Sequence, residues 1–287
     1  MQNTNQQKLF DHRKILASME RAKRINKKDA DFLIRLAIEV LSERLSVTNR
    51  DFDRALDVFS PFGCAEKLFD QTSKISDPYF LHLSHEKPFT GSMVAELDTL
   101  PIADETLNLA TSVFSLHWSN DLPGMFAQIR RALAPDGLFL CVLPGDQTLR
   151  ELRECLIEAE TKLCDSVSLR VDPFGDIRQF GGLLQRAGFS LPVVDTEIYT
   201  VRYASMFELI KDLRAMGVTG NLNQTKKFGP RGLFDEAAKI YSNKFSDEDG
   251  RIRATFEMVF LSGWAPHASQ QKPLKPGIAE ARLKDFL

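Results

Sequence analysis

Apolar residues follow two different spacings along this chain. Between residues 32 and 45 they recur every three or four positions, which predicts an amphipathic helix. Short apolar runs come next, and such runs are typical of buried parallel strands; they cover 55–59, 79–83, 93–96, 107–114 and 138–143. Helical spacing returns between them and after them, over 121–133, 148–163 and 176–187. This alternation predicts an α/β fold, a parallel sheet with helices on both faces.

Two of these helices carry recognisable start signals. Asp121 precedes an apolar stripe with Pro123 in its first turn, so we expect Asp121 to cap the helix. Thr148 is followed three residues later by Glu151, which is the spacing of a capping box and predicts an N-cap at Thr148.

The end of the chain has a different pattern. Two long runs, 192–203 and 251–264, read as strands that enclose a segment of helices and Gly/Asn-rich loop at 205–250. We expect the two strands to pair antiparallel at the sheet edge, with the helices as a flap over the strand ends. The predicted division is an N-terminal helical extension (1–50), an α/β domain (51–204 plus 251–265), the flap (205–250) and a C-terminal tail (266–287).

Composition narrows the classes of partner and compartment. The 37 basic and 39 acidic residues give a net charge of -2, which disfavours nucleic acid and favours a protein or small-molecule partner. No apolar run approaches the roughly 20 residues that span a bilayer, and the polar start lacks a secretory apolar segment. Four cysteines without a CxxC pair suit reduced thiols, so we expect a cytoplasmic protein without an integral membrane segment.

The turn after the first predicted strand is the expected ligand site of such a sheet. It reads "ALDVFSPFG", residues 55–63, with an acid at Asp57 and a glycine at Gly63. Glycines let backbone N–H groups approach a ligand, whereas Phe59 adds a ring and Pro61 has no N–H to donate. From physics alone, this turn is a poor phosphate-binding loop. Asp57 is equally consistent with an acid that anchors a ligand and with an ordinary solvated or capping carboxylate.

The loop after the fourth predicted strand, "SLHWSND" at 115–121, is the densest cluster of polar and aromatic residues. We take Ser115, His117 and Trp118 as candidates to face a substrate, the alternative being that the two rings only pack beneath the loop. No G-x-S-x-G elbow is present, which disfavours a serine hydrolase. His82 and His85 lack partners at metal-ligand spacing, so no metal site is predicted.

Two signatures make the chain recognisable, "SLHWSNDLPG" (115–124) and "QQKPLKPG" (270–277). With "LLQRAGFSLPVVD" (183–195), they resemble the class I S-adenosylmethionine-dependent methyltransferases, and among these the bacterial relatives of NADH:ubiquinone oxidoreductase (complex I) assembly factor 5. The malonyl carrier-protein methyltransferases of biotin synthesis are more distantly similar. The resemblance covers most of the chain, from "LFDHRK" to the C-terminus.

The resemblance implies a Rossmann-like sheet of seven strands with the last strand antiparallel. It also implies S-adenosyl-L-methionine as cofactor and a protein substrate. For the assembly factor itself, it implies hydroxylation of an arginine in a quinone-site subunit of respiratory complex I.

Position by position, the resemblance is incomplete at the cofactor. The family turn "LDLGCGxG" aligns with residues 56–63, where Asp57 and Gly63 match and two glycines are replaced. His82 stands where the family has the acid that binds ribose. Glu96 and Leu97 align with the element near the adenine, and Glu96 keeps an acid there. The implied cofactor-binding residues are therefore Asp57, Gly63, His82, Glu96 and Leu97, in a weakened site.

Three functional hypotheses follow. The first is a methyltransferase-like enzyme of the complex I assembly family that methylates or otherwise modifies a protein partner. The second is a non-catalytic assembly or chaperone module that keeps the fold and has lost the cofactor. The third is an altered cleft that binds another small molecule or none.

Overall fold

The computed structural model describes residues 8–83, 91–164, 167–223 and 229–271. The C-terminal signature "QQKPLKPG" therefore lies mostly outside the described residues. No helix in the described ranges is long and apolar enough to cross a membrane. The four cysteines are free thiols, and Cys64, Cys141 and Cys155 are buried.

One sheet of seven strands organises the molecule, in the order β3-β2-β1-β4-β5-β7-β6. The strands are β1 Phe52–Val58, β2 Ile75–His82, β3 Ser92–Val94, β4 Leu107–Val113, β5 Leu133–Pro144, β6 Ser190–Tyr203 and β7 Ile252–Trp264. Strands β1 to β5 pair in parallel, whereas β7 runs antiparallel to both β5 and β6. The predicted antiparallel last strand is confirmed.

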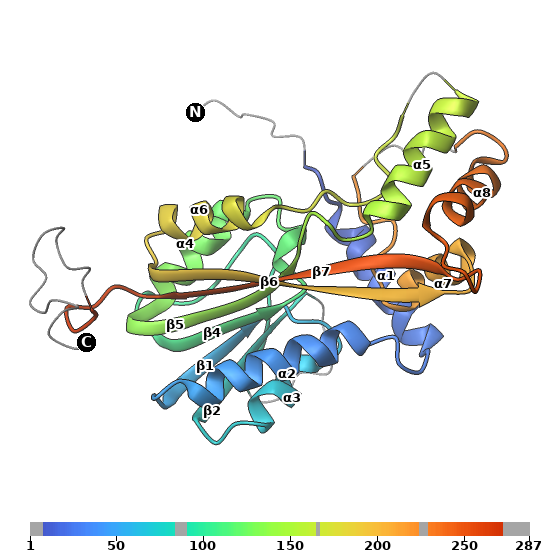
Figure 1. Cartoon of the computed structure of the whole chain (residues 1–287). Coiled ribbons are helices and arrows are strands. Elements are labelled where there is room, and N and C mark those ends of the chain that lie inside the picture. Colours follow the sequence, from blue (N-terminus) through green and yellow to red (C-terminus); the bar gives the residue numbers. More distant parts are fainter. Residues whose placement is uncertain (1–7, 84–90, 165–166, 224–228, 272–287) are drawn as a thin grey trace, which may run out of the picture.

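Helices cover both faces of this sheet, as the alternation of patterns predicts (Figure 1). Helices α2 (Phe32–Val47) and α3 (Cys64–Asp70) cover one face, and α4 (Leu122–Ala132) and α6 (Ile177–Arg186) cover the other. Each face has its own apolar core because the strand side chains alternate between the two faces. The fold class is therefore the predicted doubly covered α/β sheet.

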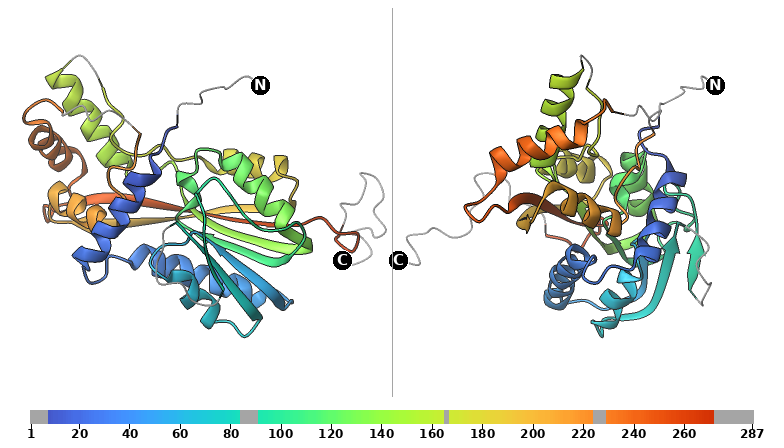
Figure 2. Two further views of the ribbon diagram at one scale, coloured as in Figure 1. Left: turned by 180° about the vertical axis from the view of Figure 1, so that it is seen from behind. Right: turned by 90° about the vertical axis from the view of Figure 1, so that its right-hand side faces the viewer.

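The long β6–β7 pair extends past the parallel strands and carries a second group of helices (Figure 1). Helices α5 (Arg150–Leu163), α7 (Met206–Ala215) and α8 (Leu233–Phe245) pack on the extension around a third apolar core. Helix α1 (His12–Ile25) crosses between the sheet and this group, as seen from behind in Figure 2. The Ser18 hydroxyl donates to the Gly217 carbonyl (2.7 Å) and ties α1 to the end of α7.

The two predicted helix starts have different outcomes. Asp121 caps α4 by accepting from the Gly124 N–H at 2.9 Å, which confirms that prediction. The capping box at Thr148 is wrong, because α5 begins only at Arg150 and its N-cap makes no side-chain hydrogen bond. Thr148 instead exchanges hydrogen bonds with the backbone of Glu257, and Glu151 accepts from Thr255. The side chains of Thr148 and Glu151 therefore bind residues of β7 instead of capping α5.

Candidate functional site

The turn after β1 has a left-handed backbone. Phe59 (φ 63°), Phe62 (φ 58°) and Gly63 (φ 65°) all occupy the region that glycine enters without cost. For the two phenylalanines this conformation costs about 1–2 kcal/mol each. The chain thus keeps a glycine-type turn with aromatic side chains in it, and the neighbouring structure must stabilise them.

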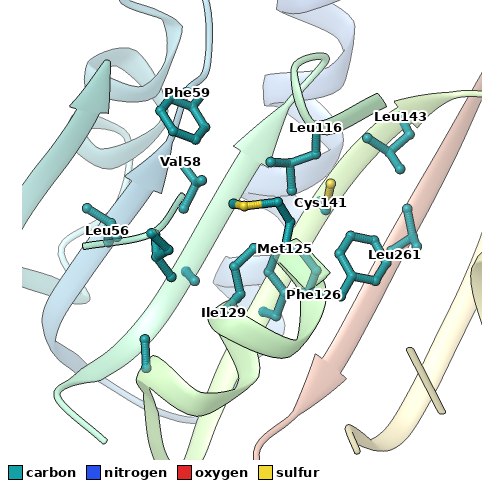
Figure 3. Packing of buried hydrophobic residues seen from close by; sticks show 14 of the residues in the cluster. Leu56, Val58, Phe59, Leu116, Met125, Phe126, Ile129, Cys141, Leu143 and Leu261 are labelled. Carbon is teal, nitrogen blue, oxygen red and sulfur yellow. The ribbon is translucent and has the colours of Figure 1, made fainter. Parts of the chain in front are cut away.

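Phe59 receives that stabilisation from the core. Its ring is 2% exposed and belongs to the apolar cluster between the sheet and α4. Figure 3 shows the ring beyond Val58 and Leu56, at the end of β1. The space left beside it, the small cavity, has a volume of about 40 Å³ and is lined by residues 59–63, by His82 and Leu83, and by α1.

Asp57 lies beneath the turn and is held entirely by the protein. Its carboxylate accepts from the Ser60 N–H (3.0 Å), the Ser60 hydroxyl (2.6 Å) and the Thr111 hydroxyl (3.1 Å). Burial raises the pKa of Asp57 to about 7, and the nearby Glu66 charge adds to the rise. These contacts close the turn onto β4 and engage both carboxylate oxygens of Asp57.

The other predicted cofactor residues fall into two groups. Gly63 and His82 line the small cavity, and the His82 ring stacks on Phe80 with the centroids 6.4 Å apart. Glu96 is exposed and Leu97 is buried in the core, and neither lines the small cavity. Gly63 and His82 thus share the small cavity, and Asp57 lies beneath the same turn. Glu96 and Leu97 follow Ala95, whose N–H donates to the His82 carbonyl (3.1 Å), but they do not line that cavity.

S-adenosyl-L-methionine, the cofactor implied by the resemblance, does not fit the small cavity beside Phe59. Small-molecule sites usually enclose about 300–1,000 Å³, far above the 40 Å³ of the small cavity. Phe59 fills the space, and Pro61 offers no N–H. A ligand at this place requires the Phe59 ring to move.

A much larger cavity, of about 1210 Å³, lies at the carboxyl ends of β1, β4 and β5. Pro61 and Phe62 reach it from the first turn, His117 and Trp118 from the short helix η1 (Leu116–Trp118), and Pro144 from the end of β5. Its apolar walls come from α5, α7 and β7 and include Leu149, Leu152, Leu156, Leu213, Phe256 and Met258. We call this space the large cavity.

Two of the three predicted substrate-facing residues lie on its wall. The His117 and Trp118 ring centroids are 4.4 Å apart, and His117 packs against Phe174 at 5.9 Å. Burial lowers the pKa of His117 to about 3, so the imidazole is neutral at physiological pH. Its Nδ1 is buried and has no hydrogen-bond partner in the described part of the chain. Ser115 is fully buried, with its hydroxyl donating to the Val58 carbonyl (3.2 Å).

Sequence reasoning missed two further polar residues of the large cavity. Asp172 accepts a hydrogen bond from the Trp118 indole N–H (3.3 Å), and burial raises its pKa to about 6. Asn221 is fully buried, and neither atom of its amide has a partner among the described residues. Both lie in irregular segments, where periodicity gives no signal, so nothing in the sequence distinguishes them from surface residues.

Comparison with known proteins shows relatives of two kinds. The mitochondrial arginine-hydroxylase NDUFAF5 of Dictyostelium discoideum is 41% identical over 186 residues, 64% of this chain but only 43% of that protein. The same protein of Rattus norvegicus is 35% identical over 257 residues, 86% of this chain and 74% of that protein. A malonyl-[acyl-carrier protein] O-methyltransferase of Xylella fastidiosa is 36% identical over 169 residues, 58% and 55% of the two chains.

The fold comparison agrees. A family described as a methyltransferase domain matches residues 76–141, a range that begins after the altered turn. The crystal structure of the YcgJ protein of Bacillus subtilis superposes with a TM-score of 0.55 at 12% identity, covering 82% of this chain and all of that one (100%). With 35% identity across most of both chains, this chain belongs to the family of the NDUFAF5 arginine-hydroxylases, built on the class I methyltransferase fold.

Proposed function

We propose that this chain modifies an arginine side chain of a protein partner, and that the side chain enters the large cavity. The observation that carries the proposal is the position of this cavity, because ligands of open α/β sheets bind beyond the carboxyl ends of the strands. Its 1210 Å³ exceed what one arginine needs and leave room for neighbouring residues of the partner. The names of the relatives supply the residue type and the reaction, arginine hydroxylation.

The methyltransferase domain supports S-adenosyl-L-methionine as the cofactor of this fold. We propose that the chain binds it weakly, because the Phe59 ring occupies the turn where Asp57, Gly63 and His82 meet. The roles of these three residues, and of Glu96 and Leu97, stay predictions.

A subunit of respiratory complex I is the partner that we propose, encountered in the cytoplasm. Support comes from the family membership and from the near-neutral net charge of -2, which suits a protein partner better than nucleic acid. The rival hypothesis of a non-catalytic assembly module rests on the filled turn. The hydroxylase relatives favour the enzyme.

The test is a reaction of the chain with a quinone-site subunit of complex I that contains arginine, followed by mass spectrometry. One arm is supplied with O2 and a two-electron reductant as the oxygen source, and the other with S-adenosyl-L-methionine as the methyl donor. The expected product carries one additional oxygen atom or one additional methyl group on an arginine. A Leu152→Trp variant fills the large cavity from α5 and should abolish the modification, whereas Ile157→Trp, on the exposed side of the same helix (43% exposed), should not. Unmodified substrate with the wild-type chain, or full activity of folded Leu152→Trp, would refute the proposal.

A further inference from the structure

We propose that Asp172, held by Trp118, binds the positively charged end of the ligand in the large cavity, a guanidinium group. The inference rests on the proposed function and adds to it the residue that selects arginine by its charge. The Trp118 indole N–H donates to Asp172 Oδ2, and this hydrogen bond holds the carboxylate on the cavity wall beside η1.

The Asp172 carboxylate is short of partners. An ionised carboxylate has about four lone-pair directions, and Trp118 is the one hydrogen-bond partner of Asp172 among the described residues. The neighbouring cation in sequence, Arg170, is occupied by Glu160 at 2.7 Å. A carboxylate shielded from water and lacking a cation is costly for the free protein, and a bound cation removes that cost.

The surroundings of Asp172 also match a guanidinium. The cavity wall next to Asp172 carries the rings of Trp118, His117 and Phe174. A planar guanidinium group stacks on aromatic faces while its N–H groups bind a carboxylate. His117 is uncharged because burial depresses its pKa, so it does not repel the cation. Carboxylate and aromatic faces together favour arginine over a neutral side chain.

Most other charges on the cavity lie on α1, on α7 and on the segment between α1 and α2. The cations of the lining are Lys14, Arg21, Lys23, Lys27, Lys28, Arg170 and Arg214. Lys14 is paired with Asp11 (3.9 Å), and Lys27 is paired with Asp212 (2.7 Å). Asp29 and Asp31 are paired with Arg35 (3.2 and 2.7 Å). Two acids on the lining, Asp172 and Glu257, have no basic partner in the described structure. Glu257 accepts from the Gln147 N–H at 2.9 Å, whereas Asp172 lies beside the aromatic rings, so Asp172 is the acid that a stacked guanidinium would meet.

The test uses two peptides that differ only at their centre, one with arginine and one with citrulline, the neutral analogue of the same shape. Binding to the full chain is measured by calorimetry and by the fluorescence of Trp118 in a Trp264→Phe background. A charge-assisted hydrogen bond of the usual strength predicts roughly tenfold or greater preference for the arginine peptide. The citrulline peptide should also change the Trp118 emission less, because its neutral side chain does not form an ion pair with Asp172, the hydrogen-bond partner of Trp118.

Asp172→Asn removes the charge and keeps an oxygen for the Trp118 N–H. We expect it to lower the affinity for the arginine peptide to that for the citrulline peptide. The matched control is Asp29→Asn, on the same cavity but paired with Arg35 and in a left-handed conformation (φ 62°) that asparagine tolerates. It should leave the preference unchanged.

The outcomes separate this inference from the proposed function. If folded Asp172→Asn keeps the wild-type preference for the arginine peptide, another residue of the cavity binds the guanidinium group. In that case the inference alone is overturned. If the wild-type chain binds neither peptide, or binds both equally, the arginine substrate itself is refuted, and the inference with it.

Discussion

Phe59 shows how an aromatic residue can occupy a glycine-type turn. The backbone is left-handed at φ 63°, while the ring, 2% exposed, is buried in the core between the sheet and α4. Burial of a phenylalanine stabilises by roughly 1.5–3 kcal/mol, which offsets the backbone strain of about 1–2 kcal/mol. The ring that completes the core thus also narrows the small cavity beside the turn.

Replacement of Phe59 by glycine should reopen the turn. We expect Phe59→Gly to bind S-adenosyl-L-methionine at least ~10-fold more tightly than the wild type in calorimetric titration, at a loss of about 2–4 kcal/mol in stability from the lost ring. The comparison variant is Phe62→Gly, at the same turn with a similar φ of 58° and lining both cavities. It separates the loss of the Phe59 ring from a looser turn backbone, and its gain in affinity should be smaller. Equal affinity in wild type and Phe59→Gly would show that the ring is not the obstacle.

Asp57 gives the turn a pH dependence with a defined sign. Its pKa is raised from 3.8 to about 7 in the folded chain, so the folded state binds more protons than the unfolded state between these values. The stability that this group contributes is complete below about pH 4 and is lost as the pH rises through about 7.

Compared with Asp57→Asn, the wild type should therefore lose about 2 to 4 kcal/mol of relative stability between pH 4 and 7.5, measured by urea unfolding. The opposite pH effect of His117, whose pKa is lowered, is common to both proteins and cancels. Asp53→Asn, at an exposed position of the same strand, should show no such trend. A constant difference between wild type and Asp57→Asn across this range would contradict the account.

At the scale of elements, α5 is anchored by its tertiary contacts. Glu151 is 4% exposed and accepts from both the backbone N–H (3.1 Å) and the hydroxyl of Thr255 on β7. A capping pattern in the sequence assigned this glutamate to its own helix, because local rules cannot see a strand that lies a hundred residues away. The bond orients the α5 wall of the large cavity.

Loss of the hydrogen bonds between Glu151 and Thr255 should destabilise the fold. Glu151→Ala leaves the buried Thr255 donors without a partner, and we expect it to lower the free energy of unfolding by about 2–4 kcal/mol. Glu154→Ala, on the exposed surface of the same helix where the carboxylate pairs with Lys244 (2.9 Å), should cost about 0–1 kcal/mol. Similar losses in the two variants would mean that α5 is held by its apolar face alone.

At the scale of the whole molecule, regular patterns predicted the sheet well. Short apolar runs gave β1 to β5, and the long runs at 192–203 and 251–264 gave the antiparallel pair β6–β7. The fold follows from periodicity because every strand buries one face or both. The position of Trp118 at the strand ends was predictable for the same reason.

The large cavity was not predictable, because its walls come from separate parts of the chain. Asp172 follows α5, Asn221 follows α7, and the rings of η1 follow β4, so only the folded chain brings them to one space. The filled turn was predicted as a defect at Phe59 and Pro61. Asp57 closes the turn through Ser60 and Thr111, and this contact depends on β4, which lies some fifty residues away in the sequence, so no local pattern predicts it.

The central claim is that the large cavity, beside a filled cofactor turn, receives an arginine side chain. The most direct measurement is a crystal structure of the chain with the arginine-centred peptide. The account predicts the arginine side chain within the large cavity, its guanidinium against Asp172 and beside the rings of Trp118 and Phe174, with Phe59 unmoved. A peptide bound elsewhere on the surface, with the large cavity empty of its arginine, would contradict it.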